Sequence, residues 1–131
     1  MSRFLFIDTR VRDSAVFGWL DDESAHKIWK VPTGASGLIS SLSARISPKD
    51  AQSAKGVCVV SGPGSFSSIR TGTLVANLMS RIFNLPLYEL MAEDVDVDTI
   101  DVKKITSRRS KKYVAPIYDR PPNVTAPKIK A

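Results

Sequence analysis

The chain has 131 residues, 43% of them hydrophobic, so it can bury one modest core and should form a single domain. Its single cysteine excludes a disulfide framework and favours a reducing, cytoplasmic environment, and its short apolar runs predict neither a membrane anchor nor a signal peptide. The net charge of +6 is concentrated in residues 103–131, which hold nine Lys or Arg against one Asp. Such a segment suits RNA phosphates or an acidic partner, or it only keeps the chain in solution.

The first predicted elements are three strands. Arg3–Thr9 has a nearly continuous apolar centre, which is typical of a central strand covered on both faces. Ser14–Leu20 follows, and His26–Val31 then alternates polar and apolar residues like a strand with one solvated face. The short turns between these segments predict an antiparallel meander.

Two helices and two more strands come next. Leu38, Leu42 and Ile46 recur every four residues and predict a short helix over Ser36–Ile46. The following segments are a polar connection (Pro48–Lys55), a fourth strand (Gly56–Gly62), a longer helix (Ser65–Phe83) and a fifth strand (Leu87–Leu90). The order β-β-β-α-β-α-β predicts an α/β fold with a mixed sheet. It is the order of a ribonuclease H-like lobe, the unit that actin-like ATPases carry twice with ATP between the copies.

The composition changes after Leu90. Residues 93–101 hold five carboxylates, and residues 103–112 hold six cations. Tyr113–Tyr118 could form one more strand, and a proline-rich tail closes the chain. We expect residues 1–90 to form the lobe and residues 91–131 to form a separate short segment. Within that segment, four cations beside Tyr113 are candidate RNA contacts, and the alternative is that they neutralise the acidic run: Arg108, Arg109, Lys111 and Lys112.

The stretch VVSGPGSFSSIRTG, residues 59–72, joins the fourth strand to the second helix through a glycine-rich turn. A turn of this kind at a helix start can hold a phosphate, although the Gly-Lys-Ser/Thr ending of a P-loop is missing. Ser65 is the predicted N-cap, since its hydroxyl can accept a bond from the first helical turn. Arg70 could brace the turn.

This stretch resembles the signature of the bacterial TsaB (YeaZ) family, a hydrophobic strand followed by G-P-G-S-F-T-G-L-R-x-G. The matching residues are Gly62, Pro63, Gly64, Ser65, Phe66, Arg70 and Gly72. FLFIDT, NLPLYEL and YVAPIYDRPP also resemble family segments. The chain departs from the family pattern at two places. Arg10 stands where members carry a small residue, and the stretch VPTGASG stands where they often carry a His-Ser-Glu-like motif. Residues 91–131 replace most of the family's second lobe, so the chain resembles a short, minimal form.

The resemblance implies a function in making threonylcarbamoyladenosine at tRNA position 37. Family members are non-catalytic partners of the related TsaD transferase, and the ATPase TsaE binds the assembled pair. We therefore expect no cofactor of the chain's own, with ATP and Mg²⁺ only in the assembled complex, and contact with tRNA only indirectly. A homodimer is a further possibility. The alternatives are an RNA-binding accessory protein and a degenerate actin-like ATPase or glycoprotease homologue.

The inventory of reactive side chains is small. A Ser-His-Asp peptidase would depend on the one histidine, His26, which lies in an amphipathic strand. The spacing of Asp94, Asp96 and Asp98 matches the first ligand positions of a calcium-binding loop. The Gly and Glu that such a loop requires further along are missing. We expect neither a catalytic residue nor a metal site.

Small side chains recur along both predicted helices. In the second helix they follow intervals of four, and such a strip lets another helix approach closely. The resemblance implies that these two helices form a four-helix contact with TsaD or with a second copy, and the alternative is that the small residues pack within the chain. The candidate partner-binding residues are Gly37, Ser41, Ala44, Ser68, Gly72, Ala76 and Ser80.

Overall fold

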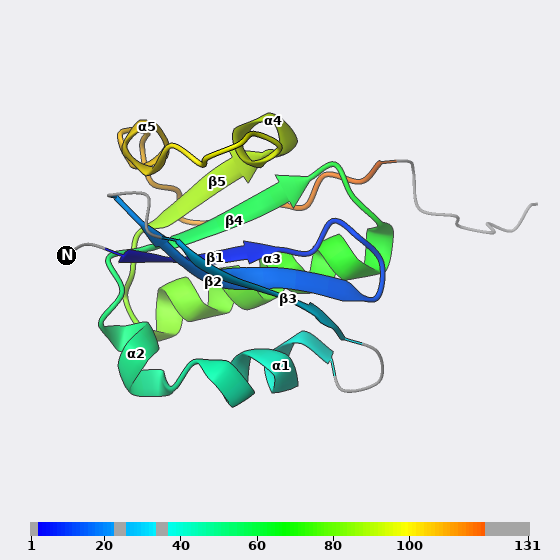
Figure 1. Cartoon of the computed structure of the whole chain (residues 1–131), viewed down its shortest axis with the longest axis horizontal. Coiled ribbons are helices and arrows are strands. Elements are labelled where there is room, and N and C mark those ends of the chain that lie inside the picture. The colour runs from blue at the N-terminus through cyan, green and yellow to red at the C-terminus, as the bar shows by residue number, and fades with distance from the viewer. Residues whose placement is uncertain (1–2, 23–25, 34–36, 120–131) are drawn as a thin grey trace, which may run out of the picture.

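A computed structural model of the chain describes residues 3–22, 26–33 and 37–119, in which one mixed sheet lies between two helical layers (Figure 1). The five strands follow the order β3-β2-β1-β4-β5. This arrangement confirms the predicted α/β fold with the strand order of a ribonuclease H-like lobe. The strand bounds are β1 Arg3–Asp8, β2 Ser14–Asp21, β3 Lys27–Pro32, β4 Val57–Gly62 and β5 Leu87–Met91.

Strand direction follows from how the strands are connected. The short turns between β1, β2 and β3 make these pairs antiparallel, with Phe4 opposite Leu20 and Phe17 opposite Trp29. Helical crossovers precede and follow β4, so β1, β4 and β5 run parallel. Every residue of β4 is buried, as expected of a parallel strand covered on both faces.

The first helical layer contains α1 (Gly37–Arg45), α2 (Pro48–Gln52) and α3 (Phe66–Ile82). Helix α3 packs across β4 and β1. The prediction of a polar connection over Pro48–Lys55 was wrong, because α2 forms there. The Ser47 hydroxyl caps α2 by accepting a bond from the Asp50 N–H at 3.1 Å, and proline is tolerated at a helix start. Ala51 of α2 is buried in the core.

The second helical layer comes from the acidic and basic runs. Short helices α4 (Ala92–Val95) and α5 (Val102–Thr106) lie over the other face of the sheet (Figure 1). Ile100, Val102 and Ile105 are buried in a cluster with Phe4 and Phe6 of β1. These three apolar side chains among the charges therefore attach this segment to the sheet and are part of its core.

The last described segment, residues 111–119, is extended, and we call it the strap. The prediction of a strand over Tyr113–Tyr118 was wrong, since the strap makes only isolated bridges, Leu87 with Lys111 and Gly64 with Tyr118. The predicted helix start Ser36 and the proline-rich tail from Arg120 lie outside the described residues. Within the described parts of the chain, no helix has the length and apolar character needed to cross a bilayer.

Candidate functional site

The glycine turn between β4 and α3 is filled by other segments of the same chain. A Cβ atom at Gly62 would collide with the carbonyl oxygen of Ile117 in the strap, and one at Gly64 would lie 2.8 Å from the Cα of Arg10. The Gly64 N–H donates to the Ile117 carbonyl at 3.1 Å. Phe66 stacks against Tyr118 with ring centroids 4.6 Å apart. The glycines thus admit neighbouring backbone, which is a role unlike that of a phosphate cradle.

Ser65 occupies the predicted N-cap position, but its side chain makes no capping bond. Its N–H donates to the Arg10 carbonyl at 3.0 Å, and its carbonyl accepts from the Ile69 N–H. Pro63 is exposed at the tip of the turn. Ser65 therefore connects α3 to the turn that follows β1.

Arg10 fills the turn after β1 with its own guanidinium. It lies 2.9 Å from the carboxylates of both Asp8 and Asp96. These bonds raise the pKa of Arg10, and the bond from Arg10 lowers the pKa of Asp96. The position at which the resemblance implies a small residue is thus taken by a large cation paired within the chain.

The two central small residues of α3, Gly72 and Ala76, are buried against the chain's own sheet, which corrects their interpretation as partner contacts. Gly72 is buried, and a Cβ atom there would collide with Thr9 at the end of β1. Ala76 belongs to the main core cluster. Ser68 accepts a bond from the Asp13 N–H, and Ser80 donates to the Leu85 carbonyl at 2.6 Å. The strip lets α3 approach β1 closely, because only small side chains fit between helix and sheet.

None of the small residues of α1 is buried, and their interpretation as partner contacts stays a prediction. Gly37 borders a polar pocket of about 170 Å³ that Thr9, Ser68 and Thr71 also line. Ser41 is half-buried and donates to the Gly37 carbonyl, while Ala44 is exposed.

The open apolar surface of this layer is a groove between α1, α2 and α3, with a volume of about 430 Å³. Leu78 and Ile82 of α3 line it and are 45% and 70% exposed, and Ile39 of α1 is 64% exposed. None of the seven predicted small residues lines it. The groove residues are Ile39, Leu42, Ser43, Ile46, Ser47, Pro48, Ala51, Val75, Leu78, Met79, Ile82 and Phe83.

Sequence reasoning missed this groove as a site, although its signal is present. Leu74, Leu78 and Ile82 recur at intervals of four on the side of α3 opposite Ala76. Helix α3 has one side of small residues and one side of large apolar residues. Its sequence does not determine which of the two sides packs against the sheet. The structure decides this, since Gly72 and Ala76 are buried and the larger residues are exposed.

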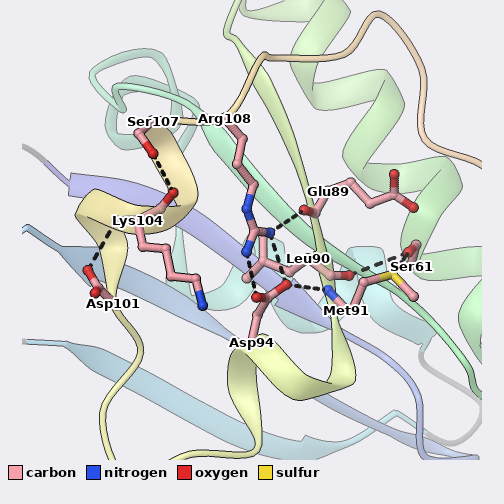
Figure 2. A network of polar contacts seen from close by, with 9 residues as sticks. All are labelled: Ser61, Glu89, Leu90, Met91, Asp94, Asp101, Lys104, Ser107 and Arg108. Carbon is pink, nitrogen blue, oxygen red and sulfur yellow. Dashed lines mark hydrogen bonds and ion pairs between the residues drawn. The ribbon is translucent and has the colours of Figure 1, made fainter.

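The candidate RNA contacts divide into two pairs. The Arg108 guanidinium forms two bonds to the Asp94 carboxylate, at 2.9 and 2.6 Å, and also donates to the Glu89 carbonyl (Figure 2). Lys111 lies 2.6 Å from the Glu89 carboxylate. The bond from Arg108 lowers the pKa of Asp94. Arg109 and Lys112 are exposed and form no ion pair with a described residue.

His26 and Cys58 hold structural positions. The Asp21 N–H donates to His26 Nδ1 at 3.0 Å, and His26 Nε2 lies 3.3 Å from the Ile100 carbonyl oxygen. The histidine therefore connects the β2–β3 turn to the second helical layer. Burial raises the pKa of Cys58 to about 12. Among residues 3–22, 26–33 and 37–119, no group of three or more His, Cys, Asp or Glu side chains could hold a metal ion.

Comparisons with known proteins agree with this fold. YeaZ from Pseudomonas aeruginosa matches at a TM-score of 0.57 and 15% identity, over 70% of this chain and 43% of that chain. A structure described as an uncharacterized protein with similarity to peptidase YeaZ from Pseudomonas aeruginosa matches at 0.57 and 17%, over 70% and 44%. The chain shares the fold of part of YeaZ, and it spans less than half the length of these two structures. No protein-family model and no curated protein matches its sequence.

Proposed function

We propose that this chain is a non-catalytic, cytoplasmic scaffold subunit for threonylcarbamoyladenosine modification of tRNA, and that it pairs with a TsaD-like transferase through α1 and α3. The observation that carries the proposal is the apolar groove on these helices, with Leu78 and Ile82 exposed on one side and Ile39 on the other. A soluble chain rarely leaves such side chains in one groove without a partner. The YeaZ fold supports this choice of partner.

The non-catalytic role is supported by the glycine turn. The strap and Arg10 take the space beside Gly62 and Gly64, so the turn lacks room for a phosphate. Any ATP and Mg²⁺ would then be held by the transferase or by a TsaE-like ATPase in the assembled complex. The tRNA would meet this subunit only indirectly. Two of the four candidate RNA contacts, Arg108 and Lys111, already pair with carboxylates, and Arg109 and Lys112 are the two that remain exposed.

The test is co-purification with the TsaD-like subunit of the same organism. The double variant Leu78→Asp/Ile82→Asp places two charges in the groove, and we expect pairing to fall at least about a hundredfold. Both side chains are exposed, so the variant should fold. The matched control is Val97→Asp, which alters an exposed apolar residue between α4 and α5, away from the groove.

A modification assay gives the functional readout. The wild-type chain and Val97→Asp should support threonylcarbamoyladenosine formation by the transferase, and the groove variant should not. Unchanged pairing of a folded groove variant, or ATP hydrolysis by the isolated chain, would refute the proposal.

A further inference from the structure

The helical layer that bears the groove carries charge of one sign. Residues 37–83 contain five Lys or Arg and a single carboxylate, Asp50, which lies 3.7 Å from Arg3 of β1. All five cations are exposed, and none forms an ion pair with a described residue. They are Arg45, Lys49, Lys55, Arg70 and Arg81.

Among the described residues outside this layer, five of the eleven cations form an ion pair, namely Arg3, Arg10, Arg12, Arg108 and Lys111. Arg10, Arg108 and Lys111 each lie within 2.9 Å of a carboxylate of the same chain. The carboxylates of residues 93–101 belong to the opposite layer of the molecule (Figure 1). The groove layer therefore presents cations to which the described residues offer no carboxylate.

Two of these cations lie along one edge of the apolar side of α3, and neither is among the residues that line the groove. Leu74, Leu78 and Ile82, spaced by four residues, form an exposed ridge along the helix. Arg70 precedes Leu74 by four positions and Arg81 follows Leu78 by three, so each lies next to the ridge. The two arginines are eleven residues apart, about three helical turns or about 16 Å, and so lie on the same side of the helix.

We propose that the groove binds an amphipathic helix whose apolar side meets Leu78 and Ile82 and whose flanking positions carry Asp or Glu that reach Arg70 and Arg81. This inference rests on the proposed function and names the chemistry of the partner surface. A second copy of the chain does not fit, because it would bring the same unpaired cations to the interface. Juxtaposed like charges disfavour such a pairing, while opposite charges speed the encounter.

The test compares charge reversal on and off the groove layer. Arg70→Glu/Arg81→Glu is measured against Arg109→Glu/Lys112→Glu, which makes the same change in net charge at exposed positions outside residues 37–83, one after α5 and one in the strap. Association with the TsaD-like subunit is followed by stopped flow at low salt (about 0.02 M) and high salt (about 0.5 M). Sedimentation of the wild-type chain alone gives its oligomeric state.

We expect the groove-side reversal to slow association at least about tenfold at low salt, with the difference from the control shrinking at high salt. The wild-type chain should sediment as a monomer. Equal rates for the two reversals, or a homodimer that Leu78→Asp/Ile82→Asp dissociates, would overturn the inference. If Leu78→Asp/Ile82→Asp abolishes pairing while the charge reversals have equal effects, only the inference on charge fails. If no variant affects pairing, the proposed function fails as well.

Discussion

At the scale of single residues, the glycines of the motif are explained by what lies beside them. Gly62 admits the Ile117 carbonyl, Gly64 the backbone of Arg10, and Gly72 the side chain of Thr9. Glycine is used where another segment approaches closely, and all three neighbours belong to the same chain. A motif that resembles a ligand cradle in sequence thus serves to join β1, the strap and α3.

Gly72→Ala tests this explanation. Alanine favours a helix over glycine by about 1 kcal/mol, but its Cβ would collide with Thr9, and overpacking typically costs about 1–3 kcal/mol. We expect a net loss of stability in urea unfolding. Thr9→Ala should recover much of it in the double variant, because the collision involves the Thr9 side chain, whose buried hydroxyl has no bonding partner among the described residues. A Gly72→Ala variant that is more stable than the wild-type chain would contradict the expected collision with Thr9.

At the scale of elements, one buried side chain of α3 connects that helix to the strap. Asn77 donates to the Val114 carbonyl and accepts from the Val114 N–H, both at 2.9 Å, much as a neighbouring strand would. The strap then reaches β4, where the Ile117 N–H donates to the Ser61 carbonyl at 2.7 Å. An isolated segment without a continuous ladder is thereby held in place along α3.

Asn77→Ala should loosen the strap. The variant leaves a buried N–H and a buried carbonyl without partners, which should cost about 1–3 kcal/mol. Hydrogen exchange should show lost protection at the Val114 amide, with α1 little affected. Thr71→Ala removes only an exposed hydroxyl bond on the same helix and should change stability by less than about 0.5 kcal/mol. Full protection at Val114 in Asn77→Ala would show that the strap is held by other contacts.

At the scale of the whole molecule, one ion pair joins the two helices of the second helical layer and another attaches that layer to the turn after β1. Arg108 joins the end of α5 to Asp94 of α4, and Arg10 joins the turn after β1 to Asp96. Asp94 also accepts a bond from the Met91 N–H at 2.8 Å (Figure 2). The Asp94 side chain is only 6% exposed, whereas that of Asp96 is 61% exposed, so Asp94 should contribute more to stability.

The fold should therefore lose stability in acid. The pKa of Asp94 is lowered below its ordinary value of 3.8, so its contribution is present above pH 4 and is lost as the pH falls through the folded-state pKa. Asp94→Asn should cost about 1–3 kcal/mol at pH 7 and show a shallower decline below pH 4 than the wild-type chain. Urea unfolding across this range measures both. If the free energy of unfolding falls with pH in parallel for the two proteins, Asp94 is not responsible for the loss of stability in acid.

Much of the fold was predictable from the sequence by itself. Apolar runs and turn residues predicted five strands and two helices in the right order, because alternation and four-residue spacing are local properties of a chain. The errors lie where local pattern is weak. Helix α2 has five residues and one buried side chain, and the strap has extended residues with no strand partner along its length.

Tertiary structure alone decided how the surfaces are used. Judged from the sequence, either side of α3 could pack against the sheet. The close approach of Thr9 to Gly72 and the exposure of Leu78 show that Gly72 faces inward and Leu78 outward. Likewise, the basic run could not reveal that Arg108 pairs with Asp94 while Arg70 and Arg81 have no carboxylate partner among the described residues. Periodicity determines which residues share a side of a helix. Which side meets the sheet depends on contacts between segments distant in the chain, such as β1 with α3.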